Sequence, residues 1–210
     1  MSWDPHRRGY HHGNLREALT KAALDLIAEK GPAGFSFAET ARAAGVSPAA
    51  PYRHFRDRDA LMAEIATRGF ETFADELARA WDEGRPDPYA AFINLGRAYL
   101  AFARAEPAYY AAMFEGALPR DSYPALDAAG QRAFDVLREA SEALCALMPK
   151  EKRPPTLMMS LHIWSMAHGI ASLFARGDAS RRPIPMPAED LLEAEVHLYL
   201  RGIGLIGEPK

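Results

Sequence analysis

The sequence holds a single cysteine, Cys145, in 210 residues, which excludes an intramolecular disulfide framework. Cys145 lies in an apolar helical stretch, so we expect a buried and inert thiol. The first residues contain no apolar segment of signal-peptide length, and no run approaches the roughly 18 apolar residues that cross a bilayer. These absences predict a cytoplasmic protein without a membrane partner.

Arrangements that signal an enzyme or a metalloprotein are also missing. No Ser-His-Asp, Cys-His or paired-carboxylate pattern with matching neighbours is visible, so we do not expect an enzyme. The clustered His6, His11 and His12 match no usual zinc spacing, and no cysteine or second acidic cluster lies nearby. We therefore expect neither a metal nor a cofactor.

The net charge of −3 is unevenly distributed, with +3 on residues 1–56 and −6 on the remainder. A basic front on an acidic body is typical of DNA contact confined to one end, although ordinary scatter is the alternative. No strand-like alternation stands out, and nearly every apolar pattern has the helical period. The sequence predicts an all-α fold of about nine helices. Beyond a first helix that ends at Gly31, they are expected at 36–55 (two helices), 57–83, 88–105, 107–116, 124–148, 155–176 and 188–206.

The segment 36–55 is the most informative part of the chain. Ser36 and Glu39 have the spacing of a capping box at a helix start. Gly45 follows where the chain must leave helical geometry, and Ser47 with Pro48 can begin a second helix. A short helix, a glycine turn and a second short helix form the helix-turn-helix layout, whose second helix enters the DNA major groove.

The motif GVSPAAPYRHF, followed by Arg58-Asp59-Ala60-Leu61, resembles the tetracycline-repressor-type (TetR) family of bacterial transcriptional regulators. The likeness extends from Tyr10 to about Phe70, and a Trp-x-x-x-His-Gly pattern from Trp164 resembles the C-terminal domain of one branch. It implies a helix-turn-helix DNA-binding domain over 10–57 and a helical ligand-binding and dimerisation domain over 58–207. Pro51 departs from the larger apolar residue usual in the family, and it cannot donate to the Ser47 carbonyl. We expect a recognition helix that opens with a loose turn.

The resemblance and the side-chain chemistry together assign the DNA contacts. Tyr52 and His54 are expected to bind phosphates as in the family, although packing on the first helix is the alternative for Tyr52. Arg53 can make a bidentate contact with guanine, and Arg58 adds charge near the start of the next helix. Arg7 and Arg8 form either a minor-groove arm or a disordered tail. The full set is Ser36, Ser47, Pro48, Ala49, Tyr52, Arg53, His54 and Arg58.

Residues 88–176 are rich in aromatic and methionine side chains, which form either an ordinary helical core or a pocket for a small apolar or aromatic effector. In the family, this region forms a small-molecule cavity. His168 either contacts that ligand or bonds a backbone carbonyl across the core. The candidate lining residues are Phe102, Tyr109, Met113, Phe114, Met158, His162 and Met166.

The last two helices carry an apolar stripe broader than one internal face requires, and family members pair these helices into a four-helix bundle. We therefore expect a homodimeric, ligand-responsive repressor that binds a palindromic operator and is released by a small molecule. The alternative is a DNA-binding regulator without an effector, controlled by abundance or a protein partner. The stripe consists of Leu191, Leu192, Val196, Tyr199, Ile203 and Ile206.

Overall fold

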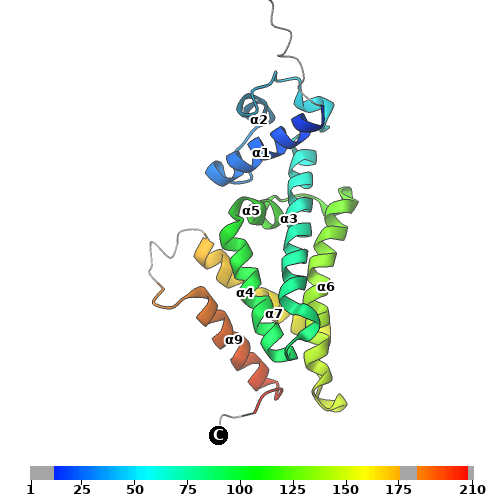
Figure 1. The fold of residues 1–210 in the computed structure, drawn as a ribbon, viewed down its shortest axis with the longest axis vertical. Helices are drawn as coiled ribbons and strands as arrows, with labels where there is room; N and C mark the ends of the chain where they lie inside the picture. Colours follow the sequence, from blue (N-terminus) through cyan, green and yellow to red (C-terminus); the bar gives the residue numbers. More distant parts are fainter. Residues whose placement is uncertain (1–11, 176–183, 208–210) are drawn as a thin grey trace, which may run out of the picture. The chain divides into compact units, whose positions relative to one another are not determined.

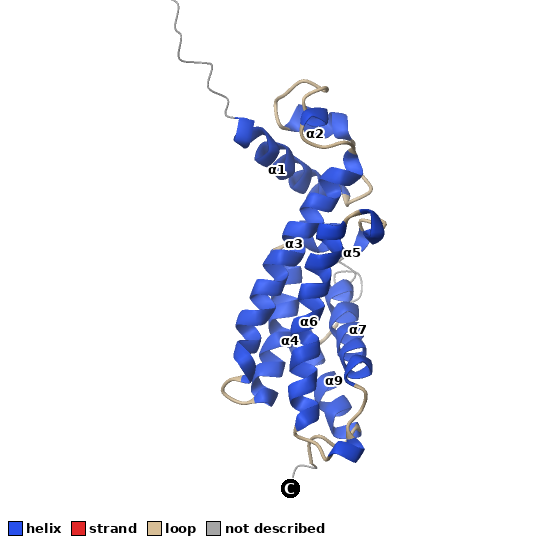
Figure 2. Cartoon of the chain, turned by 90° about the vertical axis from the view of Figure 1, so that its right-hand side faces the viewer, coloured by secondary structure: helices blue, strands red, loops and turns tan. Residues whose placement is uncertain are grey.

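The computed structural model describes residues 12–175 and 184–207, and that part of the chain is all-α, with no strand (Figures 1 and 2). The described residues contain eight α-helices, close to the predicted number of about nine, and the second helix of the helix-turn-helix is a single 3-10 turn. The helices are α1 (His12–Lys30), α2 (Phe37–Ala43), α3 (Arg58–Trp81), α4 (Pro88–Ala105), α5 (Pro107–Glu115), α6 (Pro124–Ala146), α7 (Thr156–Ala175) and α9 (Ala188–Gly202). The 3-10 turns are η1 (Pro51–Arg53), η2 (Asp82–Gly84), η3 (Arg120–Ser122) and η4 (Lys150–Lys152).

The chain forms two compact units, which we call the first and the second unit. The first contains the residues up to Gly69 together with Ala108–Leu126, and the second contains Phe70–Pro107 and the residues from Asp127 onward. Helices α3 and α6 each contribute to both units.

The turn after α2 in the first unit has the geometry that the sequence predicts. The capping box is confirmed: the Ser36 Oγ accepts from the Glu39 N–H at 3.2 Å, and the Glu39 carboxylate accepts from the Ser36 N–H at 2.9 Å. Gly45 has φ +71°, and the N–H groups of Gly45 and Val46 donate to carbonyls in the last turn of α2. This hydrogen-bond pair is a Schellman motif, which ends the helix and redirects the chain.

The second unit is built around contacts of α4 with α7 and α9, and of α7 with α9. Leu192, Val196 and Leu200 of α9 are buried in this packing, and the Leu192 side chain lies against Gly96 of α4. Cys145 is buried, as expected, and burial raises the pKa of its thiol.

Helix α7 corrects one expectation from the sequence. Within the described residues, Thr156–Phe174 is long and apolar enough to cross a bilayer, with a mean hydropathy of 1.2 over 18 residues. The core helix of a soluble protein meets the same test of length and composition, and α7 packs on α4 and α9. One such helix is weak evidence for a membrane span.

Candidate nucleic-acid interface

The recognition segment, which we define as Ser47–Phe55, is not an α-helix as predicted but a series of turns around η1. Pro51 has no N–H to donate to the Ser47 carbonyl, which accepts instead from the Ala50 N–H at 2.9 Å. The Arg53 N–H donates to the Ala50 carbonyl at 3.2 Å, which continues the tighter i to i+3 pattern. No side chain caps this turn.

One side of the recognition segment is buried and the other is exposed. Pro51 and Phe55 point into the first unit, and the expected core position of Phe55 is confirmed by its exposed fraction of 4%. Tyr52 packs the edge of its ring against Phe37 of α2, with the centroids 4.9 Å apart, yet 64% of the residue stays exposed. Packing is therefore part of its role, although against α2 instead of the first helix. The exposed residues of the segment are Ser47, Pro48, Ala49, Tyr52 and Arg53.

The Ser36 side chain, although exposed, is used by the helix cap. The Glu39 carboxylate binds the Ser36 hydroxyl and N–H and also pairs with Lys30 at 2.9 Å. Hydrogen bonds from Lys30 and Ser36 lower the pKa of Glu39 to about 2. A DNA contact through the Ser36 hydroxyl stays a prediction, since this group already has partners.

Arg58 turns toward the interior of the first unit. Its guanidinium lies 4.6 Å from the ring centroid of Phe35 and donates to the Phe35 carbonyl at 3.0 Å. It also donates to the Pro32 carbonyl and pairs with Asp59 at 3.3 Å. A phosphate contact by Arg58 stays a prediction, and it would require the side chain to leave these partners.

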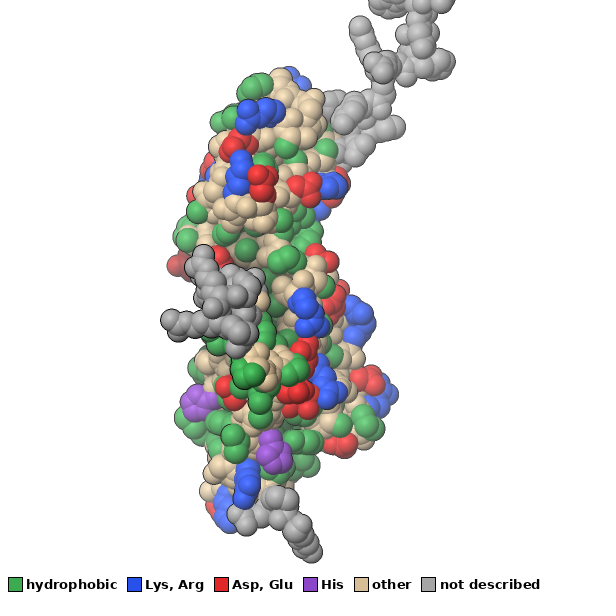
Figure 3. Space-filling view, turned by 90° about the vertical axis from the view of Figure 1, so that its left-hand side faces the viewer, with side chains coloured by type: hydrophobic (Ala, Val, Ile, Leu, Met, Phe, Trp, Pro, Cys, Tyr) green, Lys and Arg blue, Asp and Glu red, His purple; other side chains and the backbone are tan. Residues whose placement is uncertain are grey.

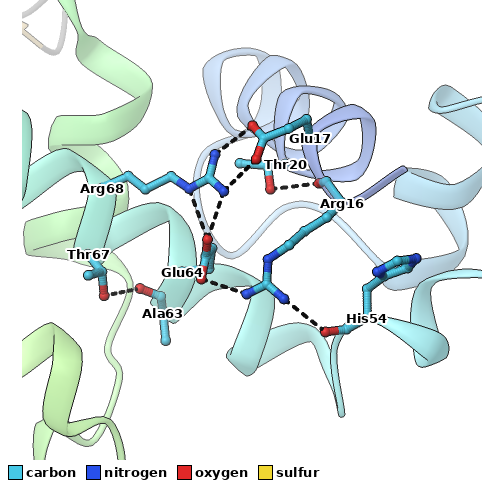
Figure 4. A network of polar contacts seen from close by, with 8 residues as sticks. All are labelled: Arg16, Glu17, Thr20, His54, Ala63, Glu64, Thr67 and Arg68. Atoms are coloured by element: carbon cyan, nitrogen blue, oxygen red, sulfur yellow. Dashed lines mark hydrogen bonds and ion pairs between the residues drawn. The ribbon is translucent and has the colours of Figure 1, made fainter. Parts of the chain in front are cut away.

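A polar network between α1, α3 and the recognition segment was not predicted from the sequence (Figure 4). Arg16 donates to the His54 carbonyl at 3.5 Å and to Glu64 at 2.8 Å. Arg68 donates to Glu64 at 2.9 Å and to both oxygens of Glu17 at 2.7 Å. The only local signal in the sequence is the i,i+4 spacing of Glu64 and Arg68 on α3.

The predicted lining residues are divided between the two units. Tyr109, Met113 and Phe114 lie on α5 in the first unit, where Met113 is buried against Gly69 of α3. The ring of Phe114 packs on Tyr110, with a centroid distance of 4.8 Å. In the first unit, these side chains take part in helix packing.

The other four lining candidates lie in the second unit, and two of them are at its surface. Phe102 is buried, Met166 is half-buried, and Met158 and His162 are exposed. Within one chain, Met158 and His162 therefore do not line an interior cavity. The His162 Nδ1 lies 3.2 Å from the Tyr199 hydroxyl.

Two further features of the second unit bear on ligand binding. The Nδ1 of His168 lies 3.1 Å from the Tyr99 hydroxyl, and its ring packs beside Trp164 at 5.6 Å. One hydrogen-bond partner of His168 is thus the side chain of Tyr99, and a contact of His168 with a ligand stays a prediction. A surface groove between α4 and α9 is lined by other residues, namely Tyr89, Ala90, Ile93, Asn94, Arg97, Glu193, Ala194 and His197.

Several sequence expectations fall on residues whose side chains lie outside the described part. These are the histidine cluster His6, His11 and His12, and the arm residues Arg7 and Arg8. In the described ranges 12–175 and 184–207, no group of three or more His, Cys, Asp or Glu side chains has an arrangement that could hold a metal ion.

Comparison with known proteins gives separate matches to two parts of the chain. A family model for bacterial regulatory proteins of the tetR family matches residues 19–65, and a model described as the tetracyclin repressor-like C-terminal domain matches residues 92–199. An uncharacterized HTH-type transcriptional regulator of Bacillus subtilis, YobS, is 31% identical over 100 residues. That match covers 48% of this chain and 51% of YobS, so it spans about half the length of this curated relative.

Solved structures show the same fold over nearly the whole chain. A protein with unknown function from Rhodococcus sp. RHA1 is 32% identical, with a TM-score of 0.76, and the match covers 93% of this chain and 98% of that one. The TetR family transcriptional regulator PfmR from Thermus thermophilus is 22% identical, with a TM-score of 0.68, and covers 87% and 97%. Because the C-terminal model alone spans half of the chain, and the N-terminal model covers the helix-turn-helix, the chain belongs to the TetR family of DNA-binding transcriptional regulators, which are not enzymes.

Proposed function

We propose that the protein is a cytoplasmic, homodimeric repressor that binds a palindromic operator and is released by a small apolar or aromatic molecule. In this proposal, residues 10–57 form the DNA-binding domain, and residues 58–207 bind the effector and form the dimer. The observation that carries it is the exposed side of the recognition segment, which presents Pro48, Ala49, Tyr52 and Arg53 while Phe55 holds the segment on the core.

The exposed residues are suited to the two kinds of contact that a DNA-binding protein makes, with bases and with phosphates. Arg53 can donate two hydrogen bonds to one guanine, and Pro48 and Ala49 offer apolar surface to thymine methyls. Tyr52 is largely exposed, and His54 lies at the end of the turn, so both are proposed as phosphate contacts with Ser36 and Ser47. On the face of the molecule shown in Figure 3, acidic and basic side chains are interspersed.

The direct test is selection of duplexes from a random-sequence library by the purified protein. A dimer with two recognition segments should select an inverted repeat whose half-sites are one helical turn, about 34–36 Å, apart. Selection of a single asymmetric site, or of no site, would contradict the proposal.

Arg53→Ala tests the base contact. We expect the affinity for the selected duplex to fall by about 1–3 kcal/mol and the preference at one base position to relax. The measurement is a titration of the selected duplex and of duplexes altered at each half-site position. An equal loss on every sequence would make Arg53 a phosphate contact instead.

The outer faces of α7 and α9 support the dimer. Leu161, Leu173 and Leu198 are exposed there, and an added Cβ on Gly169 or Gly202 would meet nothing within 4 Å, so both glycines offer room for close approach of another helix. Exposed leucines in such number on two adjacent helices are typical of an interface.

The effector is proposed to bind in the second unit, where aromatic rings and the Tyr99–His168 hydrogen bond combine apolar and polar groups. A ligand screen by thermal shift tests this step, because a molecule that binds only the folded state stabilises it by RT ln(1 + [L]/Kd). A hit that stabilises the protein should also weaken operator binding, by reciprocity. A regulator without an effector, the second candidate, would give no such compound.

A further inference from the structure

The recognition segment has little internal support. Its i to i+3 turns have poorer hydrogen-bond geometry than an α-helix, and η1 is only three residues long with no side-chain cap. Its orientation must therefore come from contacts with the rest of the first unit. Phe55 supplies one of them by burial, and the end of the segment meets a second contact from α1.

That second contact is the Arg16 side chain. Its guanidinium lies over the Phe55 ring, 4.7 Å from the centroid, and also donates to the His54 carbonyl at 3.5 Å. One planar group thus touches the ring of one residue and the backbone of its neighbour. Arginine suits this position because its guanidinium stacks on rings and donates in a fixed plane, unlike the lysine ammonium.

Arg16 is itself held in place by α3. Glu64 accepts from Arg16 through one carboxylate oxygen at 2.8 Å, and its other oxygen accepts from Arg68 at 2.9 Å. Arg68 forms a bidentate pair with Glu17, which lies on α1 like Arg16 (Figure 4). Burial raises the pKa of Glu64, but the hydrogen bonds from Arg16 and Arg68 outweigh burial and leave the pKa below its usual value. Glu64 is therefore the ionised centre that joins the two arginines.

We propose that Arg16, held by Glu64 and Arg68, is a positioning residue that sets the orientation of the recognition segment for operator binding. This inference rests on the proposed function as an operator-binding protein. An isolated surface ion pair contributes little to stability, but a network with a bidentate member has a defined geometry. Its effect is expected in specific binding more than in folding.

Glu64→Gln tests this inference, because electrostatics and positioning predict opposite changes in DNA affinity. The substitution removes a negative charge from the DNA-binding unit, so long-range electrostatics alone would strengthen DNA binding. Loss of positioning instead predicts about tenfold weaker binding to a duplex selected by the wild-type protein, within the range for residues of one network. Unchanged or stronger binding would overturn the inference.

Arg16→Gln and Arg16→Lys complete the test. Both should weaken binding to the selected duplex by a similar factor, because lysine keeps the charge but cannot stack and donate in one plane. The salt dependence of binding should keep its slope, whereas a lost phosphate contact would reduce it by about one. Rescue by lysine, or a shallower slope, would make Arg16 a simple charge contact and overturn the inference. Arg138→Gln, which removes the same charge from an exposed pair with Asp135 in the second unit, is the matched control.

A measurement without DNA separates this inference from the proposed function. Hydrogen exchange of the His54 and Phe55 amides, which donate to the Pro51 carbonyl, should be faster in Glu64→Gln than in the wild type. Unchanged exchange would overturn the inference even if DNA binding fell. If the wild-type protein selects no duplex but exchange is faster in Glu64→Gln, Arg16 does position the recognition segment, and the proposed operator binding fails.

Discussion

Replacement of Leu161 and Leu198 by glutamate together is expected to convert the proposed dimer into a folded monomer that has lost most of its operator affinity. Both leucines are exposed in the single chain, at 41% and 66%, so the monomer can accept the charges. In the dimer, the same charges would be buried without partners, which costs several kcal/mol. A monomer presents one recognition segment, and loss of the linked second contact should weaken binding by roughly 10²–10⁴-fold.

Sedimentation and operator titration measure the two effects. Leu147→Glu is the matched control, because Leu147 is an exposed leucine (62%) that follows α6 in the chain and belongs to neither α7 nor α9. Circular dichroism should show the same helix content in the wild type, the double variant and Leu147→Glu. A double variant that sediments as a dimer would place the interface elsewhere.

The sequence alone could not identify which apolar residues of the last helix are exposed in the single chain. The apolar stripe on the last helix was recognised, but its period cannot tell a residue that faces its own chain from one that faces a partner. Val196 and Leu192 proved to be buried within the chain, whereas Leu198, outside the predicted stripe, is 66% exposed. A charge at Val196 would test folding and not dimerisation.

Helix boundaries were predictable where proline or a cap marks them. Helix α4 begins at Pro88 and ends at Ala105 before Glu106-Pro107, as the sequence predicts, and the structure adds an Asp87 cap. In the recognition segment, the loose turn expected from Pro51 is present. The predicted α-helix after that turn is absent, because the segment contains only the 3-10 turn η1. Pro51 cannot make the i to i+4 bond to the Ser47 carbonyl, and within the segment only the Phe55 N–H makes such a bond, to the Pro51 carbonyl at 3.0 Å.

The roles of two arginines in the first unit, Arg16 and Arg58, were the least predictable from the sequence. Arg16 and Arg58 each stack on a phenylalanine and donate to backbone carbonyls 23 to 38 positions away. Carbonyl acceptors leave no mark in a sequence, because every residue has one. A basic residue near a DNA-binding motif is therefore easily assigned to phosphate when it supports the fold.

Phe102→Ala is expected to lower the free energy of unfolding by about 3–5 kcal/mol, the usual cost of removing a buried phenylalanine. Phe102 is 1% exposed, and its ring lies 4.9 Å from that of Phe73, which also packs edge-on against Tyr99 at 5.0 Å. These contacts bury Phe102 in the second unit, and its place in an effector pocket stays a prediction. Denaturant unfolding at a fixed protomer concentration measures the loss, since the proposed dimerisation would also contribute to stability.

Met158→Ala is the comparison that separates core from pocket. Met158 is 43% exposed, so its truncation should change the free energy of unfolding by less than about 1 kcal/mol. If Phe102→Ala were equally mild, an empty space must already adjoin the ring, and Phe102 would be a pocket wall as the sequence indicated. A cavity created by Phe102→Ala would then also change the set of compounds that stabilise the protein. A large loss of stability with an unchanged ligand profile would confirm Phe102 as core and direct the search for the effector site toward the Tyr99–His168 pair.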